Sequence, residues 1–359
     1  MKMLQSLAEK FRGMVPALLL SAVVLAVTFA APTGAFAAEA GSPLTKAAYS
    51  GDKEEVGRLL AGGADVNHRD AGGATALIMA SREGHLAVVE ALLAKGAEFD
   101  VQNNNGVTAL VMASQNGRGA IVEALLAIGA EIDVRRKNGA TALFMASATG
   151  HGAIVEALLA KGAEIDVQTD TGATALIMAS REGHLAVVEA LLAKGAEIDV
   201  RRKNGATALI MASQNGHGAI VEALLAKGAK IDVQAQNDAT ALFMASQNGR
   251  GTIVEALLAK GAEIDVQTDI GATALFMASQ EGHLEVVEAL LAKGAKIDVQ
   301  TDIGATALIL ASYRGNAEIV AALLAKGANT ELRIEDGGTA LELAKNASIK
   351  SMLRAAKKP

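Results

Sequence analysis

The tripeptide Thr-Ala-Leu returns at an interval of 33 residues along almost the whole chain, and no insertion or deletion interrupts it. Its nine copies begin at Thr75, Thr108, Thr141, Thr174, Thr207, Thr240, Thr273, Thr306 and Thr339. Self-similarity at a fixed interval of about 20–50 residues is typical of a stacked-repeat architecture, in which each unit buries its apolar face only against its neighbours. Such a chain has a long surface and no deep pocket, so we expect it to hold another molecule.

Each repeat predicts two short helices followed by an extended loop. In the copy that starts at Thr75, the threonine is a good N-cap for a two-turn helix, and Gly84 permits the left-handed residue that ends it. Apolar residues at helical spacing in 88–93 predict a second helix, which stops at Gly96. Residues 103–106 (Asn-Asn-Asn-Gly) form a turn. The predicted unit is therefore helix, turn, helix and hairpin-like loop.

These residues resemble an ankyrin repeat, and the resemblance covers residues 42–359. The family's Thr-Pro-Leu-His opening corresponds to Thr-Ala-Leu followed by Ile, Val or Phe, and its Gly-His pair corresponds to Gly84-His85. Its Gly-Ala-Asp-Val-Asn stretch is intact at 63–67. The family's opening His is replaced by apolar residues, so hydrogen bonding at that position should give way to apolar contact. The resemblance implies an all-α repeat fold, a right-handed ankyrin solenoid of helix-turn-helix units with hairpin-like loops.

The N-terminus predicts export. Residues 1–13 carry three basic side chains, 14–38 carry no charge, and the uncharged stretch ends in Ala35-Phe36-Ala37. This is the layout of a secretory signal peptide with cleavage after Ala37. An uncleaved membrane anchor is the alternative, because the uncharged stretch is long enough to span a bilayer. We expect a periplasmic location, with an extracellular one as the alternative and a membrane-anchored one if the signal is not cleaved.

The predicted organisation follows from the signal and the repeats. A signal peptide occupies 1–37, a short linker 38–41, nine 33-residue repeats 42–338, and a truncated C-terminal capping repeat 339–359. The formal net charge of the whole chain is −6. Because residues 1–37 contain three basic residues and one acidic residue, the exported chain is near −8. This charge argues against nucleic acid as a ligand, since nucleic-acid binding needs a basic surface.

Neither a metal, a cofactor nor a catalytic centre is expected. The chain has no Cys, and five of its six His occupy the same place in different repeats. Stacked helices are about 8–10 Å apart, whereas each ligand of a zinc ion lies about 2 Å from the metal. Equivalent His residues therefore cannot converge on one ion. The sequence also lacks a phosphate-binding glycine loop and a nucleophile elbow. We predict a non-enzymatic protein.

Positions that vary while the rest of the repeat is constant indicate the binding surface. In the ankyrin resemblance these are the loop tips and the end of the first helix, which line the concave face. Both Tyr residues of the chain occupy this helix end, and Tyr and Arg are enriched in binding hot spots. Drift at exposed positions is the alternative explanation. The predicted partner-binding residues are Tyr49, Arg82, Glu83, Gln115, Asn116, Arg181, Glu182, Gln214, Gln247, Gln280, Tyr313 and Arg314.

Two loop tips are basic, whereas later tips carry Asp and Glu. The basic residues are Arg135, Arg136, Lys137, Arg201, Arg202 and Lys203. Such asymmetry can orient an elongated partner, although solvated turns explain it equally well. The principal hypothesis is a monomeric, non-catalytic protein–protein interaction scaffold in the cell envelope, with no stable membrane span after signal cleavage. The alternatives are a binder of an anionic envelope polymer or glycan, and a stabiliser or inhibitor of one exported enzyme.

Overall fold

The computed structural model describes residues 41–356. The predicted signal peptide and the linker up to residue 40 lie outside the described residues, so those assignments stay predictions. Among the residues that are described, no helix is both long enough and apolar enough to cross a bilayer.

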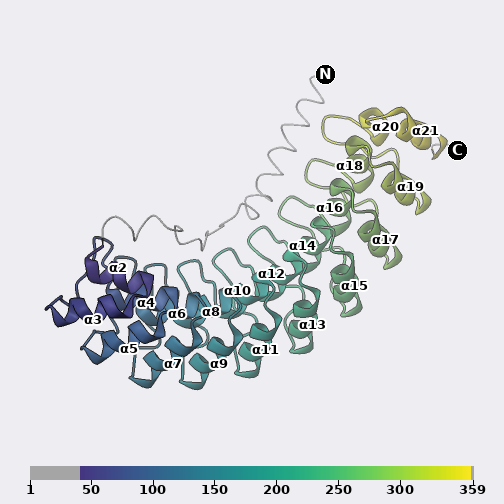
Figure 1. The fold of residues 1–359 in the computed structure, drawn as a ribbon. Helices are drawn as coiled ribbons and strands as arrows, with labels where there is room; N and C mark the ends of the chain where they lie inside the picture. The colour runs from purple at the N-terminus through teal and green to yellow at the C-terminus, as the bar shows by residue number, and fades with distance from the viewer. Residues whose placement is uncertain (1–40, 357–359) are drawn as a thin grey trace. The chain divides into compact units, whose positions relative to one another are not determined.

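The described chain is helical, as the sequence predicts, and it divides into two compact units (Figure 1). We call residues 41–203 the N-terminal unit and residues 204–356 the C-terminal unit. The N-terminal unit contains α2 (Pro43–Ser50), α3 (Lys53–Ala61), α4 (Ala76–Glu83), α5 (Leu86–Ala94), α6 (Ala109–Gln115), α7 (Gly119–Ala127), α8 (Ala142–Ala148), α9 (Gly152–Ala160), α10 (Ala175–Glu182) and α11 (Leu185–Ala193). The C-terminal unit contains α12 (Ala208–Asn215), α13 (Gly218–Ala226), α14 (Ala241–Gln247), α15 (Gly251–Ala259), α16 (Ala274–Glu281), α17 (Leu284–Ala292), α18 (Ala307–Arg314), α19 (Ala317–Ala325), α20 (Ala340–Leu343) and α21 (Ala347–Ala356).

The first helix of each repeat begins and ends at the residues that the sequence marks. The Thr75 hydroxyl accepts a hydrogen bond from the Ile78 N–H at 3.3 Å, which satisfies one free donor of α4. Gly84 ends the same helix with φ 95°, a conformation that residues with a Cβ adopt at a cost. The second helices have nine residues in most repeats and no side-chain cap. Because isolated helices of this length are marginal in water, packing must hold them in place.

Packing is strictly between neighbours. First helices contact the first helices of adjacent repeats, such as α2 with α4 and α4 with α6, and each also contacts the second helix of its own repeat. In the α4–α5 repeat, Leu77, Ala80, Val89 and Leu92 are fully buried. Ile78, which replaces the family's opening His, is buried as well, and this confirms apolar contact at that position. Burying each large side chain stabilises the stack by about 1.5–3 kcal/mol.

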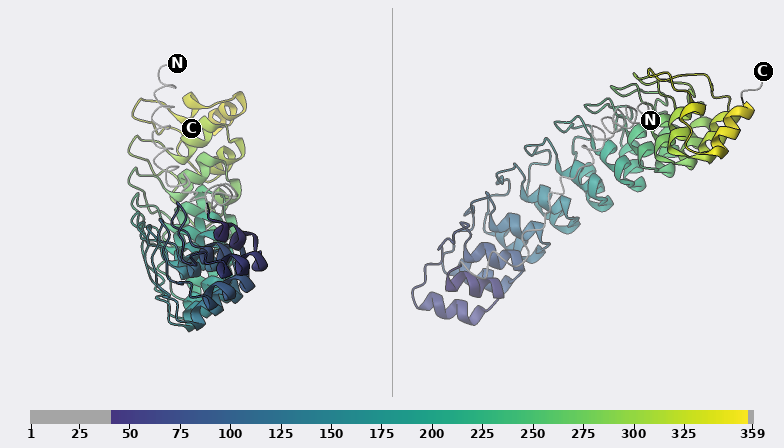
Figure 2. Two further views of the ribbon diagram at one scale, coloured as in Figure 1. Left: turned by 60° about the vertical axis from the view of Figure 1, so that its left-hand side comes forward. Right: turned by 90° about the horizontal axis from the view of Figure 1, so that it is seen from above.

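The helix pairs form two layers within each unit, and the loops extend from the layer of first helices (Figure 1). Figure 2 shows the same layers from two other directions, with the loops gathered on one side of each unit. The loops of one unit therefore lie on a common side. This arrangement places the predicted loop tips of one unit next to one another.

In several repeats, the side chain that precedes the second helix bonds back to the preceding repeat. The His85 Nε2 lies 3.0 Å from the Tyr49 carbonyl oxygen. Because a carbonyl oxygen only accepts, this ring nitrogen carries the proton. The Arg118 Nε donates to the Arg82 carbonyl at 3.2 Å from the equivalent place. These histidines therefore connect repeats, as a structural role requires.

A second set of polar side chains, one Asn or Asp in each of several repeats, also bonds to the neighbouring repeat. The Asn67 Oδ1 accepts from the Glu98 N–H of the next repeat at 2.8 Å, and the Asp133 Oδ1 accepts from the Glu164 N–H at 3.0 Å. Burial nevertheless raises the pKa of Asp133, and it raises the pKa of Asp166 in the same way. This set stabilises the stack through its hydrogen bonds, while the partial burial of the Asp133 and Asp166 carboxylates offsets part of that gain.

The first helices also carry a row of buried serines. In the part of the chain that the structure describes, eight hydroxyl groups at one equivalent position are buried and have no hydrogen-bond partner there. They belong to Ser81, Ser114, Ser147, Ser180, Ser213, Ser246, Ser279 and Ser312. A buried, unsatisfied hydroxyl destabilises a fold by about 1–3 kcal/mol. In the first repeat the same position is Ala48, which is also fully buried.

Candidate partner-binding surface

The N-terminal unit brings together five of the helix-end positions singled out by their variation. Tyr49, Arg82, Gln115 and Arg181 are half-buried in the last turns of α2, α4, α6 and α10, and Ala148 is buried in α8. The side chains of Tyr49, Arg82, Gln115 and Arg181 are therefore only partly accessible to solvent.

The acidic neighbours of the two arginines form ion pairs with them. The Arg82 Nε lies 3.3 Å from the Glu83 carboxylate, and the Arg181 Nε lies 3.2 Å from the Glu182 carboxylate. The Arg82 side chain is only 16% exposed. The predicted residues Glu83 and Glu182 thus partly neutralise the arginines, and their own oxygens are partly occupied.

The remaining predicted helix-end residues differ in their exposure to solvent. The Asn116 amide donates to the Met112 carbonyl at 2.8 Å and so completes the end of α6. In the C-terminal unit, Gln214 and Gln247 are half-buried, but Gln280 is only 6% exposed and donates to the Glu281 carboxylate at 2.7 Å. At the end of α18, Tyr313 is half-buried and Arg314 is exposed.

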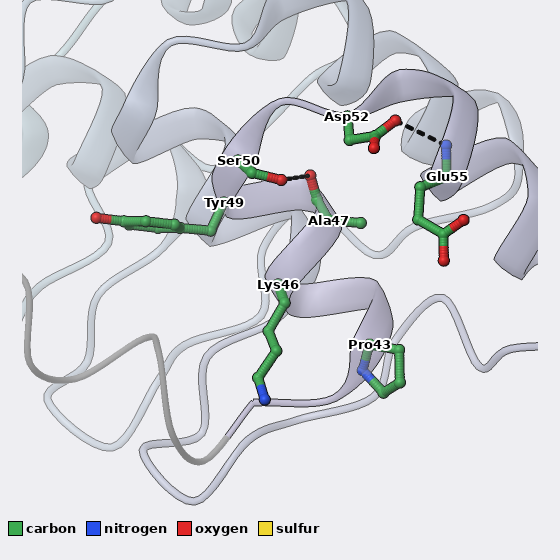
Figure 3. Close-up of a pocket in the computed structure, with 7 residues that line it drawn as sticks. All are labelled: Pro43, Lys46, Ala47, Tyr49, Ser50, Asp52 and Glu55. Carbon is green, nitrogen blue, oxygen red and sulfur yellow. Dashed lines mark hydrogen bonds between the residues drawn. The ribbon is translucent and has the colours of Figure 1, made fainter.

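A hollow of about 460 Å³ opens beside Tyr49 on the first repeat (Figure 3). The Ser50 hydroxyl donates to the Ala47 carbonyl at 3.1 Å, and the Asp52 carboxylate accepts from the Glu55 N–H at 2.9 Å. Tyr49 itself projects from α2. The hollow therefore lies beside an aromatic ring that carries a hydroxyl, which is a suitable contact for a partner side chain.

The hollow lies on the first repeat that the structure describes, where polar side chains replace buried apolar ones of the next repeat. Lys46 occupies the place that Met79 fills in the next repeat, and Glu55 occupies the place of the buried Val88. Polar residues on an outer face are what a terminal repeat needs for solubility. Tyr49 consequently lies at the edge of the described stack.

The first basic tip, residues 135–137, contains one half-buried cation between two exposed ones. The Arg136 Nη1 donates to the Met145 sulfur at 3.2 Å, and burial lowers the pKa of Arg136. No carboxylate of the described residues lies within ion-pair distance of Arg136. The Arg135 Nη2 donates to the Gln168 carbonyl at 3.2 Å and so reaches the next loop.

The second basic tip, residues 201–203, repeats this sequence and pattern of exposure. Burial lowers the pKa of Arg202, and the positive charge of Arg181 lowers it further. The end of α10 and the second basic tip therefore place two guanidinium groups near each other. The sequence does not predict that Arg181 and Arg202 lie near each other, because no motif links a helix end to a loop 21 positions later.

A ladder of backbone hydrogen bonds fixes the tips relative to one another. Lys137 N–H donates to the Asn105 carbonyl at 3.0 Å, Asp170 N–H to the Asn138 carbonyl at 2.9 Å, and Lys203 N–H to the Thr171 carbonyl at 2.9 Å. Each loop is thus bonded to the one before it. The tips are held in register by groups that every residue except proline possesses.

No group of three or more His, Asp or Glu side chains within residues 41–356 is placed to hold a metal ion. The His151 Nε2, for example, bonds the Gln115 carbonyl at 3.3 Å. The Asp166 carboxylate accepts from the Glu197 N–H at 3.1 Å. These side chains are used in connecting successive repeats.

Comparison with known proteins places the fold in a family. The chain matches the profile described as "Ankyrin repeats (3 copies)" over residues 44–136, 87–169, 110–202, 143–235, 209–301 and 275–355. It is similar to the crystal structure of the human ASB11 ankyrin repeat domain, with 32% identity and a TM-score of 0.56 over 60% of this chain and 98% of that chain. No curated protein sequence matches the chain. Ankyrin repeats generally mediate protein–protein interaction and are typically non-catalytic. The chain belongs to the ankyrin repeat family.

Proposed function

We propose that this protein is a non-catalytic scaffold that binds a protein partner through the loop tips and first-helix ends of its N-terminal unit. The observation that carries the proposal is the arrangement of that unit. The Tyr49 ring lies at the end of α2 beside an open hollow, and the two basic tips lie on loops. Backbone hydrogen bonds between successive loops hold these tips in register. A surface held in its bound geometry loses less conformational entropy on binding.

The composition of this surface favours a polar interface of modest affinity. Aromatic residues form only 3% of the chain, and the arginines at the ends of α4 and α10 already pair with neighbouring glutamates. Hot-spot energy is expected to concentrate at Tyr49 and at the cations, because aromatic and Arg side chains dominate binding energies. The partner would therefore dissociate readily at high salt.

We further propose that the scaffold acts in the cell envelope after export. The support is the sequence of residues 1–37, with its basic start, its apolar stretch and its small-residue cleavage site. Cell fractionation and the N-terminal mass of the purified chain test this proposal. An exported chain that begins at Ala38 is expected, whereas an intact N-terminus in the cytoplasm would exclude it.

The binding proposal is tested by cross-linked capture from envelope extract, followed by mass spectrometry. The bait is compared with a variant in which Tyr49, Arg82 and Arg181 are replaced by alanine. A matched control replaces three exposed residues of the same unit, Glu90 in α5 and Lys95 and Lys194 directly after α5 and α11, by alanine. We expect one protein to be captured by the native chain and by the control but lost from the binding variant. Equal loss from the control and the binding variant, or no captured protein, would refute the proposal.

A further inference from the structure

The two basic tips are built alike, and each contains one partly buried guanidinium. Both have the sequence Arg-Arg-Lys-Asn-Gly, with the middle arginine half-buried and its neighbours exposed. Arg136 rests on the sulfur of Met145 and has no carboxylate within ion-pair distance among the described residues. A planar guanidinium in such a place is suited to bind an incoming carboxylate with two parallel hydrogen bonds. The exposed lysine of each tip adds a second positive charge.

The spacing of the tips is fixed. The ladder bonds the first basic tip to the loop at 168–171, and it bonds that loop to the second basic tip, through Asp170 N–H at 2.9 Å and Lys203 N–H at 2.9 Å. Two repeat steps of about 10 Å each separate the basic tips by about 20 Å. An extended chain rises about 3.3 Å per residue, so about six residues bridge that distance. One extended segment can therefore reach both tips at once.

The loop between the basic tips selects against a uniformly charged ligand. It carries Gln168, Thr169 and Asp170, and the Asp170 side chain is exposed. Adjacent tips are about as far apart as the screening length of about 8–10 Å. Each tip therefore interacts electrostatically mainly with the part of the ligand that faces it. A polyanion with charge at every unit would place negative groups opposite Asp170. A peptide with neutral residues between two acidic clusters avoids this repulsion.

We propose that the partner of this protein presents an extended acidic segment, with two carboxylate clusters about six residues apart, to the tips at 135–137 and 201–203. The proposal rests on the proposed function and specifies its partner. Arg136 and Arg202 receive the carboxylates, Lys137 and Lys203 add attraction, and the loop at 168–171 faces the neutral middle of the segment. The two clusters bind as one bivalent ligand on a rigid pair of sites.

The test measures fluorescence anisotropy of labelled peptides with the purified full-length chain at low ionic strength. One peptide has two Glu-Glu clusters about six residues apart, a second has them about twelve apart, and a third has one cluster. A polyglutamate of equal length serves as the uniform polyanion. We expect the six-residue spacing to bind about tenfold tighter than the single cluster, because the second contact is intramolecular.

Three variants decide whether the tips are responsible. In R136Q/R202Q, the advantage of two clusters over one is expected to vanish, while K161Q/K194Q, which removes two exposed cations directly after α9 and α11 of the same unit, keeps it. Asp170→Asn is expected to increase the affinity for polyglutamate several-fold and to leave the spaced peptide nearly unchanged. Circular dichroism confirms that all three variants fold.

The result that overturns the inference is equal binding of all acidic peptides with equal loss in both double variants, since this indicates only a diffuse positive field. Tight binding of polyglutamate that Asp170→Asn does not change would favour an anionic polymer and also overturn it. Self-association of the chain that R136Q/R202Q abolishes would identify a second copy as the occupant instead. If a captured envelope protein depends on Tyr49 and Arg82 but not on Arg136 and Arg202, the proposed function stands and this inference fails.

Discussion

Replacing buried serines of the C-terminal unit by alanine is expected to stabilise it. The hydroxyls of Ser246, Ser279 and Ser312 are fully buried and have no hydrogen-bond partner among residues 41–356. Burying an unsatisfied hydroxyl costs about 1–3 kcal/mol. Alanine fits the site, because Ala48 occupies the equivalent position of the first repeat and is fully buried there. Alanine also has the higher helix propensity, by up to about 0.5 kcal/mol.

The magnitude follows from these terms. Removing one hydroxyl also removes a few dispersion contacts of about 0.1–0.2 kcal/mol each, so we expect a net gain of about 1 kcal/mol per site. The three sites lie in successive repeats about 10 Å apart and share no partner, so their effects should add to about 3 kcal/mol. For a unit of about 150 residues, this corresponds to a rise in melting temperature of about 6–12 °C.

The assay is thermal and urea unfolding of the triple variant, followed by far-UV circular dichroism. Ser351→Ala is the matched control, because Ser351 is exposed in α21 of the same unit and reports the helix propensity alone. Repeat stacks can unfold in more than one step, so the transition of each unit is fitted separately. The gain in free energy of unfolding of the triple variant is compared with three times the gain of Ser351→Ala. If the first gain is no larger than the second, the hydroxyls are hydrogen-bonded in solution and the reasoning is refuted.

Three further predictions concern single positions in the loops and helices. Asp133→Asn should stabilise the fold at neutral pH by less than about 1 kcal/mol, since Asn67 shows that an amide accepts the same bond and the site is partly solvated. Burial raises the pKa of Asp133 in the folded state above its value in the unfolded state. The charged carboxylate therefore destabilises the fold at pH values above the folded-state pKa, and this destabilisation is absent below the unfolded-state pKa. The gain should therefore vanish on acidification, as urea midpoints measured against pH will show. Asp238→Gly should stabilise by about 0.5–1 kcal/mol in urea unfolding, because φ at Asp238 is 57° and other repeats have glycine there. Gly119→Ala should raise the melting temperature, since no heavy atom lies within 4 Å of the added Cβ, whereas Gly150→Ala, at φ 79° and 2.6 Å from the next histidine ring, should lower it.

The elements of the fold could be predicted because their signals are local. Thr75 caps α4 and Gly84 ends it through contacts within a few residues, and the same Thr and Gly positions recur in the seven repeats that begin at Thr108 to Thr306. The apolar spacing of the second helices is likewise readable from one repeat. The stacking of neighbours follows from the period itself.

The details of the candidate site could not be predicted because they depend on contacts between repeats. The sequence gives no indication that Gln280 is buried and bonded to Glu281, since other repeats leave the equivalent Gln half-exposed. The proximity of Arg181 to Arg202 depends on how a loop folds over the preceding helix. Whether each predicted residue contacts a partner stays a prediction for the binding experiments.

In the backbone ladder, main-chain groups hold the repeats together, while the side chains of the same residues are exposed to a partner. Lys137 and Asp170 donate to the preceding loop through their backbone N–H groups, while their side chains remain exposed. Any residue except proline supplies that N–H, so the same position is Asn104 in one repeat and lysine or aspartate in the next two. Changes at the tips should therefore alter binding with little effect on stability. For this reason the exceptions within a nearly uniform repeat locate the candidate surface, and tip variants that lose binding are expected to unfold like the native chain.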